Sequence, residues 1–124
     1  MSNADIAREG FAAIARGDVD AISAFLDPDV KWHAGNPADG CQSRGQALAW
    51  IRGRDARGVG PLPALVDVVE AGDRVAVIMQ PHPSEDDPAP SRTANLATFR
   101  DGRVVEMVHY EDAAAALAAL GPAA

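Results

Sequence analysis

Residues 91–110, SRTANLATFRDGRVVEMVHY, contain two runs of strand-like composition separated by the pair Asp101-Gly102. Asp-Gly between two such runs is a strong signal for a two-residue β-hairpin turn. A second hairpin is indicated upstream in residues 63–80, PALVDVVEAGDRVAVIMQ, where EAGDR separates two runs rich in Val and Ile. The second half of the chain therefore predicts four consecutive strands that pair as a meander.

The last of these strands, RVVEMVH, has different residues on its two sides. One side carries Val105, Met107 and His109, and the other carries Val104, Glu106 and Val108. Because Glu106 prefers water or an interface, we expect the side with His109 to face the core. Val104, Val108 and their neighbours would then lie on the outer surface of the sheet, where apolar residues are candidates for an interface between subunits.

Helices are predicted mainly in the first half of the chain. Ser2 or Asn3 caps a first helix that ends at Gly17, and Asp18 caps a second, short helix that ends before Pro28. After a short strand, VKWH (residues 30–33), a third helix begins near Ser43, which has capping-box spacing to Gln46. A last helix, AAAALAAL, follows Asp112 and ends at Gly121.

Helices that come first and strands that come later favour an α+β fold with an antiparallel sheet over βαβ units. A curved sheet covered by helices leaves a hollow, and such a hollow is the default place to look for a ligand. Residues 81–90, PHPSEDDPAP, form a polar, Pro-rich loop between the two hairpins. The sequence leaves open whether this loop acts as a lid.

Length and composition limit the classes of protein to consider. The 124 residues suit one domain, residues 1–124, with one hydrophobic core. A net charge of −7 disfavours nucleic-acid binding, and the chain lacks an apolar run of about eighteen residues that would span a membrane. The N-terminal residues MSNADIAREG lack a signal-peptide core, and a lone Cys41 cannot form an internal disulfide. We therefore expect a cytoplasmic protein without nucleic-acid or membrane partners.

Five segments together resemble the SnoaL-like families of the nuclear transport factor 2-like superfamily. In chain order they are ARGDVDAISAFLDPDVKWHAG (15–35), GCQSRGQAL (40–48), EAGDRVAV (70–77), FRDGRVVEMVHYED (99–112) and ALAALG (116–121). The resemblance implies a cone-shaped curved antiparallel sheet that wraps around a pocket and is covered by N-terminal helices. It also implies a homodimer formed through the outer surface of the sheet. The superfamily includes polyketide cyclases, ketosteroid isomerases, epoxide hydrolases and proteins that only bind or scaffold, so the fold does not fix the chemistry.

The enzyme signatures of these relatives match this chain incompletely. The ketosteroid isomerases that the chain resembles place a catalytic Asp in the first strand, where this chain has Trp32. The Tyr in their first helix has no counterpart here, because Tyr110 is the only tyrosine. The Arg-Asp pair of the epoxide hydrolases is missing from VAVIMQ (75–80). Their last-strand Asp corresponds to His109, which could also take the place of the acid/base Asp of the cyclases.

His109 is thus the candidate catalytic residue, because a histidine can accept and donate a proton near neutral pH. The alternative is a buried histidine bonded to the backbone.

We expect Trp32 to face inward as core or as an apolar platform, and Trp50 to pack in the core or close the pocket. His33 would lie at the rim or on the surface. Asn95, together with Thr93, would bind a ligand carbonyl if it faces inward, and its facing is left open. Candidate ligand-binding residues are Trp32, His33, Trp50, Asn95 and Met107.

No metal or cofactor site is indicated. His33, His82 and His109 fall on separate elements without ligand spacing, and Cys41 has no base near it in sequence. No Gly-rich phosphate loop or dinucleotide fingerprint is present. Two hypotheses follow: a cofactor-independent isomerase or polyketide-cyclase-like enzyme acting on a small apolar carbonyl compound, or a non-catalytic ligand-binding or dimeric scaffold protein.

Overall fold

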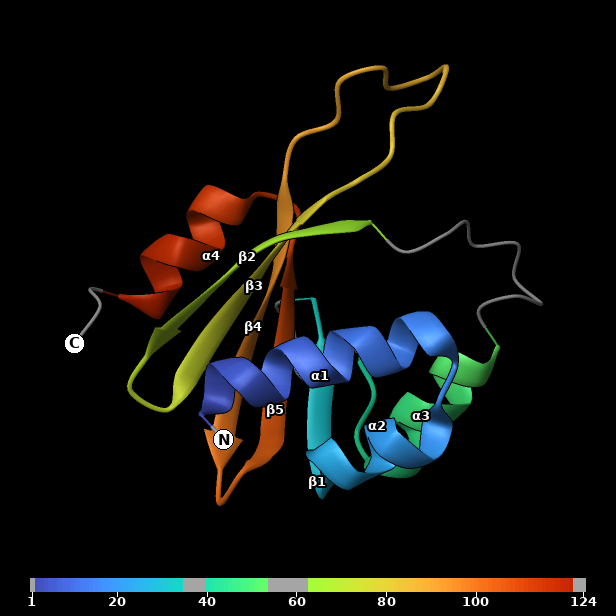
Figure 1. The fold of residues 1–124 in the computed structure, drawn as a ribbon, viewed down its shortest axis with the longest axis vertical. Coiled ribbons are helices and arrows are strands. Elements are labelled where there is room, and N and C mark those ends of the chain that lie inside the picture. Colours follow the sequence, from blue (N-terminus) through green and yellow to red (C-terminus); the bar gives the residue numbers. More distant parts are fainter. Residues whose placement is uncertain (1, 35–39, 54–62, 122–124) are drawn as a thin grey trace.

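The computed structural model describes residues 2–34, 40–53 and 63–121. Within them the chain forms four helices and five strands (Figure 1). In order these are α1 (Asn3–Arg16), α2 (Val19–Phe25), β1 (Leu26–His33), α3 (Arg44–Arg52), β2 (Ala64–Ala71), β3 (Arg74–Gln80), β4 (Thr93–Arg100), β5 (Arg103–Tyr110) and α4 (Ala113–Leu120). None of the described helices is both long enough and apolar enough to cross a membrane.

The five strands form one curved, unclosed sheet in the order β1-β5-β4-β3-β2. The meander of β2 to β5 is antiparallel throughout, as the two hairpin signals predict. β1 differs from the expected antiparallel sheet, because it runs parallel to β5. A parallel neighbour is reached only through a crossover, and here the chain between the two strands includes α3 and the strands β2, β3 and β4.

Local signals fix several ends of elements where the sequence predicts them, although β1 begins at Leu26 instead of at the predicted Val30. Asp101 and Gly102 have φ values of 54° and 78°, the left-handed pair that a type I′ hairpin turn requires. Ser2 and Asp5 form a complete capping box at the start of α1, and the hydrogen bonds with the Ser2 side chain and backbone lower the pKa of the Asp5 carboxyl. At α3 the capping box is incomplete, because Gln46 Oε1 accepts from the Gln42 backbone N–H instead of from the cap residue.

The sheet has a hydrophobic cluster on each face. On the inner face Val75, Val77 and Met79 of β3 pack in the cluster that includes residues of α1, α2 and α3. On the outer face the alternate β3 residues Ala76 and Ile78 pack in the cluster that includes residues of α4. The helices are therefore divided between the two faces, three on the inner face and α4 on the outer face (Figure 1).

A β-bulge in the last hairpin changes which residues of β5 face inward. Phe99 pairs with Val104, but Thr98 pairs with Glu106, so Val105 is an extra residue without a partner on β4. Val104 is consequently 5% exposed and belongs to the inner cluster, together with Met107. The prediction that Val104 faces outward is wrong for this reason. Val108 pairs with Leu96 of the outer cluster and stays on the outer face.

Gly10 lies in the middle of α1, where a glycine destabilises a helix by about 0.5–1 kcal/mol relative to alanine. Packing does not demand a glycine there. Apart from the backbone of the helix itself, a Cβ at position 10 would meet a single atom of the described residues within 4 Å, Phe25 Cδ2 at 3.9 Å. That distance is ordinary van der Waals contact, so an alanine would fit.

The bulge predicts unequal stability effects for two adjacent valines. Val104→Ala should lower the free energy of unfolding by about 2 kcal/mol, because it removes two buried methyl groups from the inner cluster. Val105→Ala should have less than half that effect, since Val105 is partly exposed and belongs to neither cluster. Urea unfolding of both variants measures the difference. Equal losses, or a larger loss at position 105, would contradict the register described here.

Candidate functional site

A cavity of about 580 Å³ lies between the inner face of the sheet and the helices α1 and α3. Most of its wall is apolar, and aromatic side chains come from three elements: Phe11 of α1, Trp32 of β1 and Trp50 of α3. Polar side chains come from Gln46 of α3, from Thr93 and Asn95 of β4, and from His109 of β5. The cavity therefore offers a broad apolar surface and a small polar group at the β4–β5 pair.

The two tryptophans lie close to each other in the cavity wall. Trp32 faces inward, as predicted, opposite Met107 in the β1–β5 register. The ring centroids of Trp32 and Trp50 are 6.5 Å apart, with 38° between the ring planes. Trp50 is 47% exposed, which places it at the mouth of the cavity and argues against plain core packing. Such a pair can hold a flat apolar ligand.

His33 is less accessible than the sequence suggests. It is 7% exposed, so it is neither a rim nor a surface residue, although it contributes to the lining of the cavity. Its Nε2 lies 3.2 Å from Glu106 Oε2 on the neighbouring strand. Because Val108, its register partner on β5, faces outward, the side chain of His33 leaves β1 on the side opposite to Trp32. We therefore assign His33 to the support of the β1–β5 pair.

Phe11 and Cys41 line the cavity, and both were missed as site residues from sequence. Cys41 reaches the wall through two backbone hydrogen bonds with Trp32, of 3.0 and 2.7 Å. The close approach depends on Gly40, where a side chain would overlap the carbonyl oxygen of Trp32. The sequence signal available for Cys41 was the Gly-Cys pair after a turn-rich segment. That signal does not identify Trp32 as the partner of the two backbone hydrogen bonds.

The polar group consists of a cross-strand pair, Asn95 and His109. Both side chains line the cavity, so the inward alternative for Asn95 is the correct one, and Thr93 shares that side. His109 Nδ1 lies 2.8 Å from Asn95 Oδ1. The Nδ1–H donates to the amide oxygen, which in a neutral ring leaves the lone pair on Nε2.

The remaining contacts of this pair leave it available to a ligand. The side chain of His109 is 34% exposed, and its Nε2 lies 3.8 Å from Oε1 of Glu111, whose side chain is 92% exposed. A solvent-exposed carboxylate at this distance interacts weakly with the ring. Asn95 uses its oxygen for the histidine, so its Nδ2 hydrogens can donate to an oxygen atom of a bound molecule.

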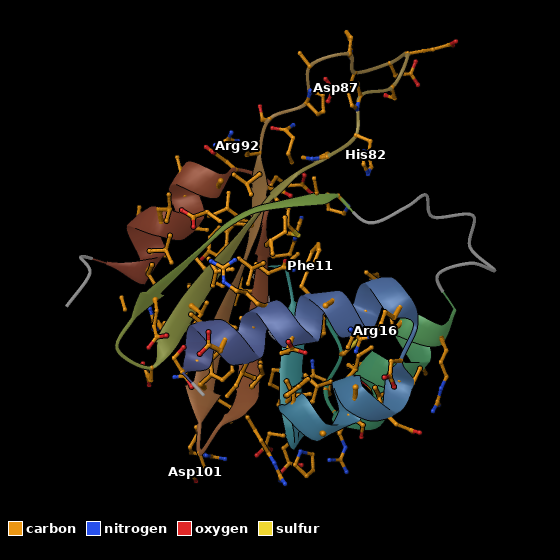
Figure 2. The ribbon with its side chains drawn as sticks, in the orientation of Figure 1. Phe11, Arg16, His82, Asp87, Arg92 and Asp101 are labelled. Carbon is orange, nitrogen blue, oxygen red and sulfur yellow. The ribbon has the colours of Figure 1, made fainter. Side chains whose placement is uncertain are left out.

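The part of the cavity wall that the structure describes contains no Asp, Glu, Lys or Arg. A ligand that fills it would therefore be neutral or nearly so, because an unpaired charge is costly to bury. Within residues 2–34, 40–53 and 63–121, His, Cys, Asp and Glu side chains form no group of three that could hold a metal ion. Figure 2 shows His82 and Asp87 on the loop that projects beyond β3 and β4, and residues 81–92 of this loop contribute nothing to the lining.

A second, smaller cavity of about 60 Å³ adjoins the first. The two share the lining residues Phe11, Ile14, Trp32 and Asn95. Met107, one of the candidate ligand-binding residues predicted from the sequence, lines this smaller space. Since several of its other lining residues are buried members of the inner cluster, we call it the inner cavity.

Comparisons with known proteins agree with this architecture. A family model described as SnoaL-like domain matches residues 7–107. A search of curated proteins finds no match. A Xanthomonas campestris protein of unknown function with a cystatin-like fold superimposes with a TM-score of 0.72 at 22% identity, covering 91% of this chain and 97% of its own.

Two further solved structures carry names that suggest an activity, although both names are provisional. One is a Sinorhizobium meliloti protein provisionally named a polyketide cyclase, with a TM-score of 0.64, 20% identity, and coverage of 85% of this chain and 93% of its own. The other is a Kribbella flavida protein provisionally named a ketosteroid isomerase, with a TM-score of 0.66, 15% identity, and coverage of 86% of this chain and 75% of its own. At these identities the likeness establishes the fold alone.

The hydrogen bond between His109 and Asn95 predicts a defined ring tautomer. Long-range ¹H–¹⁵N NMR spectra of the imidazole should show the neutral His109 ring protonated at Nδ1. In Asn95→Leu, which keeps the size but removes the acceptor, the Nδ1–H signature should be lost. Asn95→Asp, which retains an acceptor oxygen, should preserve it. An Nε2–H ring in the unmodified protein would contradict the assignment.

Proposed function

Since this chain belongs to the SnoaL-like domain family, we propose that it binds a small, neutral, mostly apolar carbonyl compound and moves a proton on it. It would act without a cofactor, as an isomerase or a polyketide-cyclase-like enzyme. The observation that carries the proposal is the 2.8 Å contact between His109 Nδ1 and Asn95 Oδ1 in the wall of an apolar cavity. The provisional names of the two solved structures are consistent with such chemistry.

In the proposed reaction His109 is the acid/base. Its Nε2 removes a proton from the carbon next to the ligand carbonyl, and the electron pair of the broken C–H bond moves into the enolate. Asn95 Nδ2–H donates to the developing enolate oxygen, and Asn95 Oδ1 accepts from Nδ1–H of the imidazolium. An isomerase then returns the proton to a different carbon. A cyclase joins the enolate carbon to a second carbonyl carbon and gives the proton to the resulting alkoxide.

The apolar wall contributes to this chemistry in two ways. Trp32 presents an aromatic surface against which a flat ligand can lie, and Trp50 can cover it from the mouth. Bound ligand also displaces water from around the polar pair. A hydrogen bond to the enolate oxygen is then stronger than the same bond in water, because the surrounding dielectric is lower.

A second candidate function, ligand binding without catalysis, is favoured by one observation. The described lining contains no carboxylate that could take the place of the catalytic Asp of the enzymes that this chain resembles. In that case Asn95 and His109 would only recognise an oxygen atom of the ligand. Both candidates predict binding of a neutral carbonyl compound, and they differ in whether His109 exchanges a proton with it.

Proton exchange on 2-tetralone, a flat ketone with an acidic α-carbon, separates the two candidates. We expect the protein to accelerate α-hydrogen exchange in D₂O, followed by NMR. His109→Gln should lower the rate by at least about 100-fold, the usual contribution of a general base. His82→Gln is the matched control, because His82 lies on the projecting loop. Bound 2-tetralone that exchanges no faster than in buffer would establish the binding role, and an unaffected rate in His109→Gln would refute the assignment of the base.

We also propose that the protein is a homodimer that pairs through the outer face of the sheet near Val108. The apolar Val108 side chain is partly exposed there and belongs to neither hydrophobic cluster. Val108→Glu should convert a dimer into a folded monomer of 12.9 kDa, measured by light scattering with circular dichroism as the folding check. Ala24→Glu, on the exposed side of α2, should stay dimeric. A monomeric unmodified protein would contradict the proposal.

A further inference from the structure

We propose that the inner cavity is a binding subsite for a short unbranched alkyl chain attached to the ligand carbonyl. The ligand class would then be alkyl ketones whose flat part occupies the main cavity. This inference rests on the proposed carbonyl ligand. It adds the nature of the second substituent on the carbonyl carbon, an alkyl chain. It is based on the inner cavity lining, its position beside Asn95, and the unfilled space at Gly10.

The lining of the inner cavity suits methylene groups. Its side chains come from α1, α2 and all strands except β2, and Asn95 is the single polar residue among those described. Lining residues such as Val77, Phe99 and Val104 are nearly fully buried. An apolar cavity of this kind is not a good site for water, which needs polar partners, and it accepts small apolar groups instead.

The position of Asn95 sets the orientation of the ligand. Asn95 lines both cavities, so an oxygen atom bonded to its Nδ2 would lie where the two spaces meet. Trp32 and Phe11 also line both. A ring against Trp32 in the main cavity therefore leaves the other substituent of the carbonyl directed toward the inner one.

The size of the inner cavity limits the chain. Its volume of about 60 Å³ corresponds to roughly four water-sized spheres, at about 15 Å³ for each. A methylene group is similar in size to a water molecule. We therefore expect room for about three or four carbon atoms beyond the carbonyl.

Gly10 shows that the inner cavity could be partly filled without a steric conflict. It lines this cavity, and a Cβ there would meet Phe25 Cδ2 at an ordinary distance of 3.9 Å. An alanine would also make α1 more stable. The open space is therefore not imposed by packing or by helix geometry, which is consistent with space reserved for a ligand. Met107, whose flexible thioether can adapt its shape, lies in the same wall.

Binding of alkyl phenyl ketones, from acetophenone to hexanophenone, tests the proposal by calorimetry. In the unmodified protein the Kd should fall about three- to fourfold with each added methylene, until the chain is three or four carbons long, and then level off. Gly10→Ala should remove the increase in affinity that the last methylene brings. Gly10→Leu should remove nearly all of the increase in affinity along the series. Met107→Ala should extend the series by at least one carbon.

Gly45→Ala is the matched control. Gly45 is also a helical glycine with room for a Cβ, whose nearest neighbour would be Ser43 Oγ at 3.8 Å, but it lies on the exposed side of α3. Gly45→Ala should leave the whole series unchanged. Thermal unfolding of every variant verifies that it is folded, and Gly10→Ala should unfold at a higher temperature than the unmodified protein. If Gly10→Leu fails to fold, Gly10→Ala and Met107→Ala still test the subsite.

The outcomes separate this subsite from the proposed function. If acetophenone binds but chain length has no effect, or if Gly10→Ala behaves like Gly45→Ala, the subsite is refuted and the carbonyl site stands. If no ketone binds, the carbonyl ligand and the subsite are both refuted. Xenon under pressure then tests the inner space alone, and unchanged methyl signals of Val77 and Val104 would show that this space is closed as well.

Discussion

The pairing register between β4 and β5 determines which side chains reach the cavity. At the Asp101-Gly102 turn, Arg100 pairs with Arg103 and Phe99 with Val104; beyond the bulge the pairing moves by one residue, and Asn95 lies opposite His109. Without the extra residue Asn95 would face Val108, and His109 would point to the other side of the sheet. The bulge therefore lets Val104 complete the core while it brings Asn95 and His109 to the same inner wall. The hydrogen bond between them and its place beside an apolar cavity both depend on this single irregularity.

Features that depend on neighbouring residues could be predicted from the sequence. Gly17 ends α1, Asp112 caps α4, and Asp101-Gly102 forms the hairpin turn, because each acts through its own backbone or through residues up to four positions away. The parallel pairing of β1 with β5 could not be predicted in this way, since these strands are separated by more than sixty residues and no local signal specifies the partner. The bulge was missed for a related reason. Its residues are all ordinary strand formers, so nothing in RVVEMVH distinguishes a regular strand from one with an extra residue.

The site was predictable in its residue types and less so in its geometry. Trp32, Trp50, Asn95 and His109 all line the main cavity, whereas Met107 lines the inner one and His33 is held by Glu106. His33 was misjudged because Glu106, which its ring contacts, lies on β5 and is remote in sequence. Phe11 is an apolar residue of α1, and the sequence pattern of a helix cannot tell whether such a residue fills the core or borders an empty space. A cavity is a space that side chains from different elements leave unfilled. The periodicity of a sequence does not show whether such a space is filled.

Cys41 gives the cavity a chemical property that its role in the fold does not require. It is the only cysteine of the chain, it is not in a disulfide, and its side chain borders the main cavity beside Trp32. A sulfhydryl reagent small enough to enter would modify this one position, and any molecule already in the cavity would slow the modification. The rate at which Cys41 is modified therefore reports whether the main cavity is occupied. The rate of thiol alkylation can rank ligands in a crude extract without labelling them and without knowing which reaction, if any, they undergo.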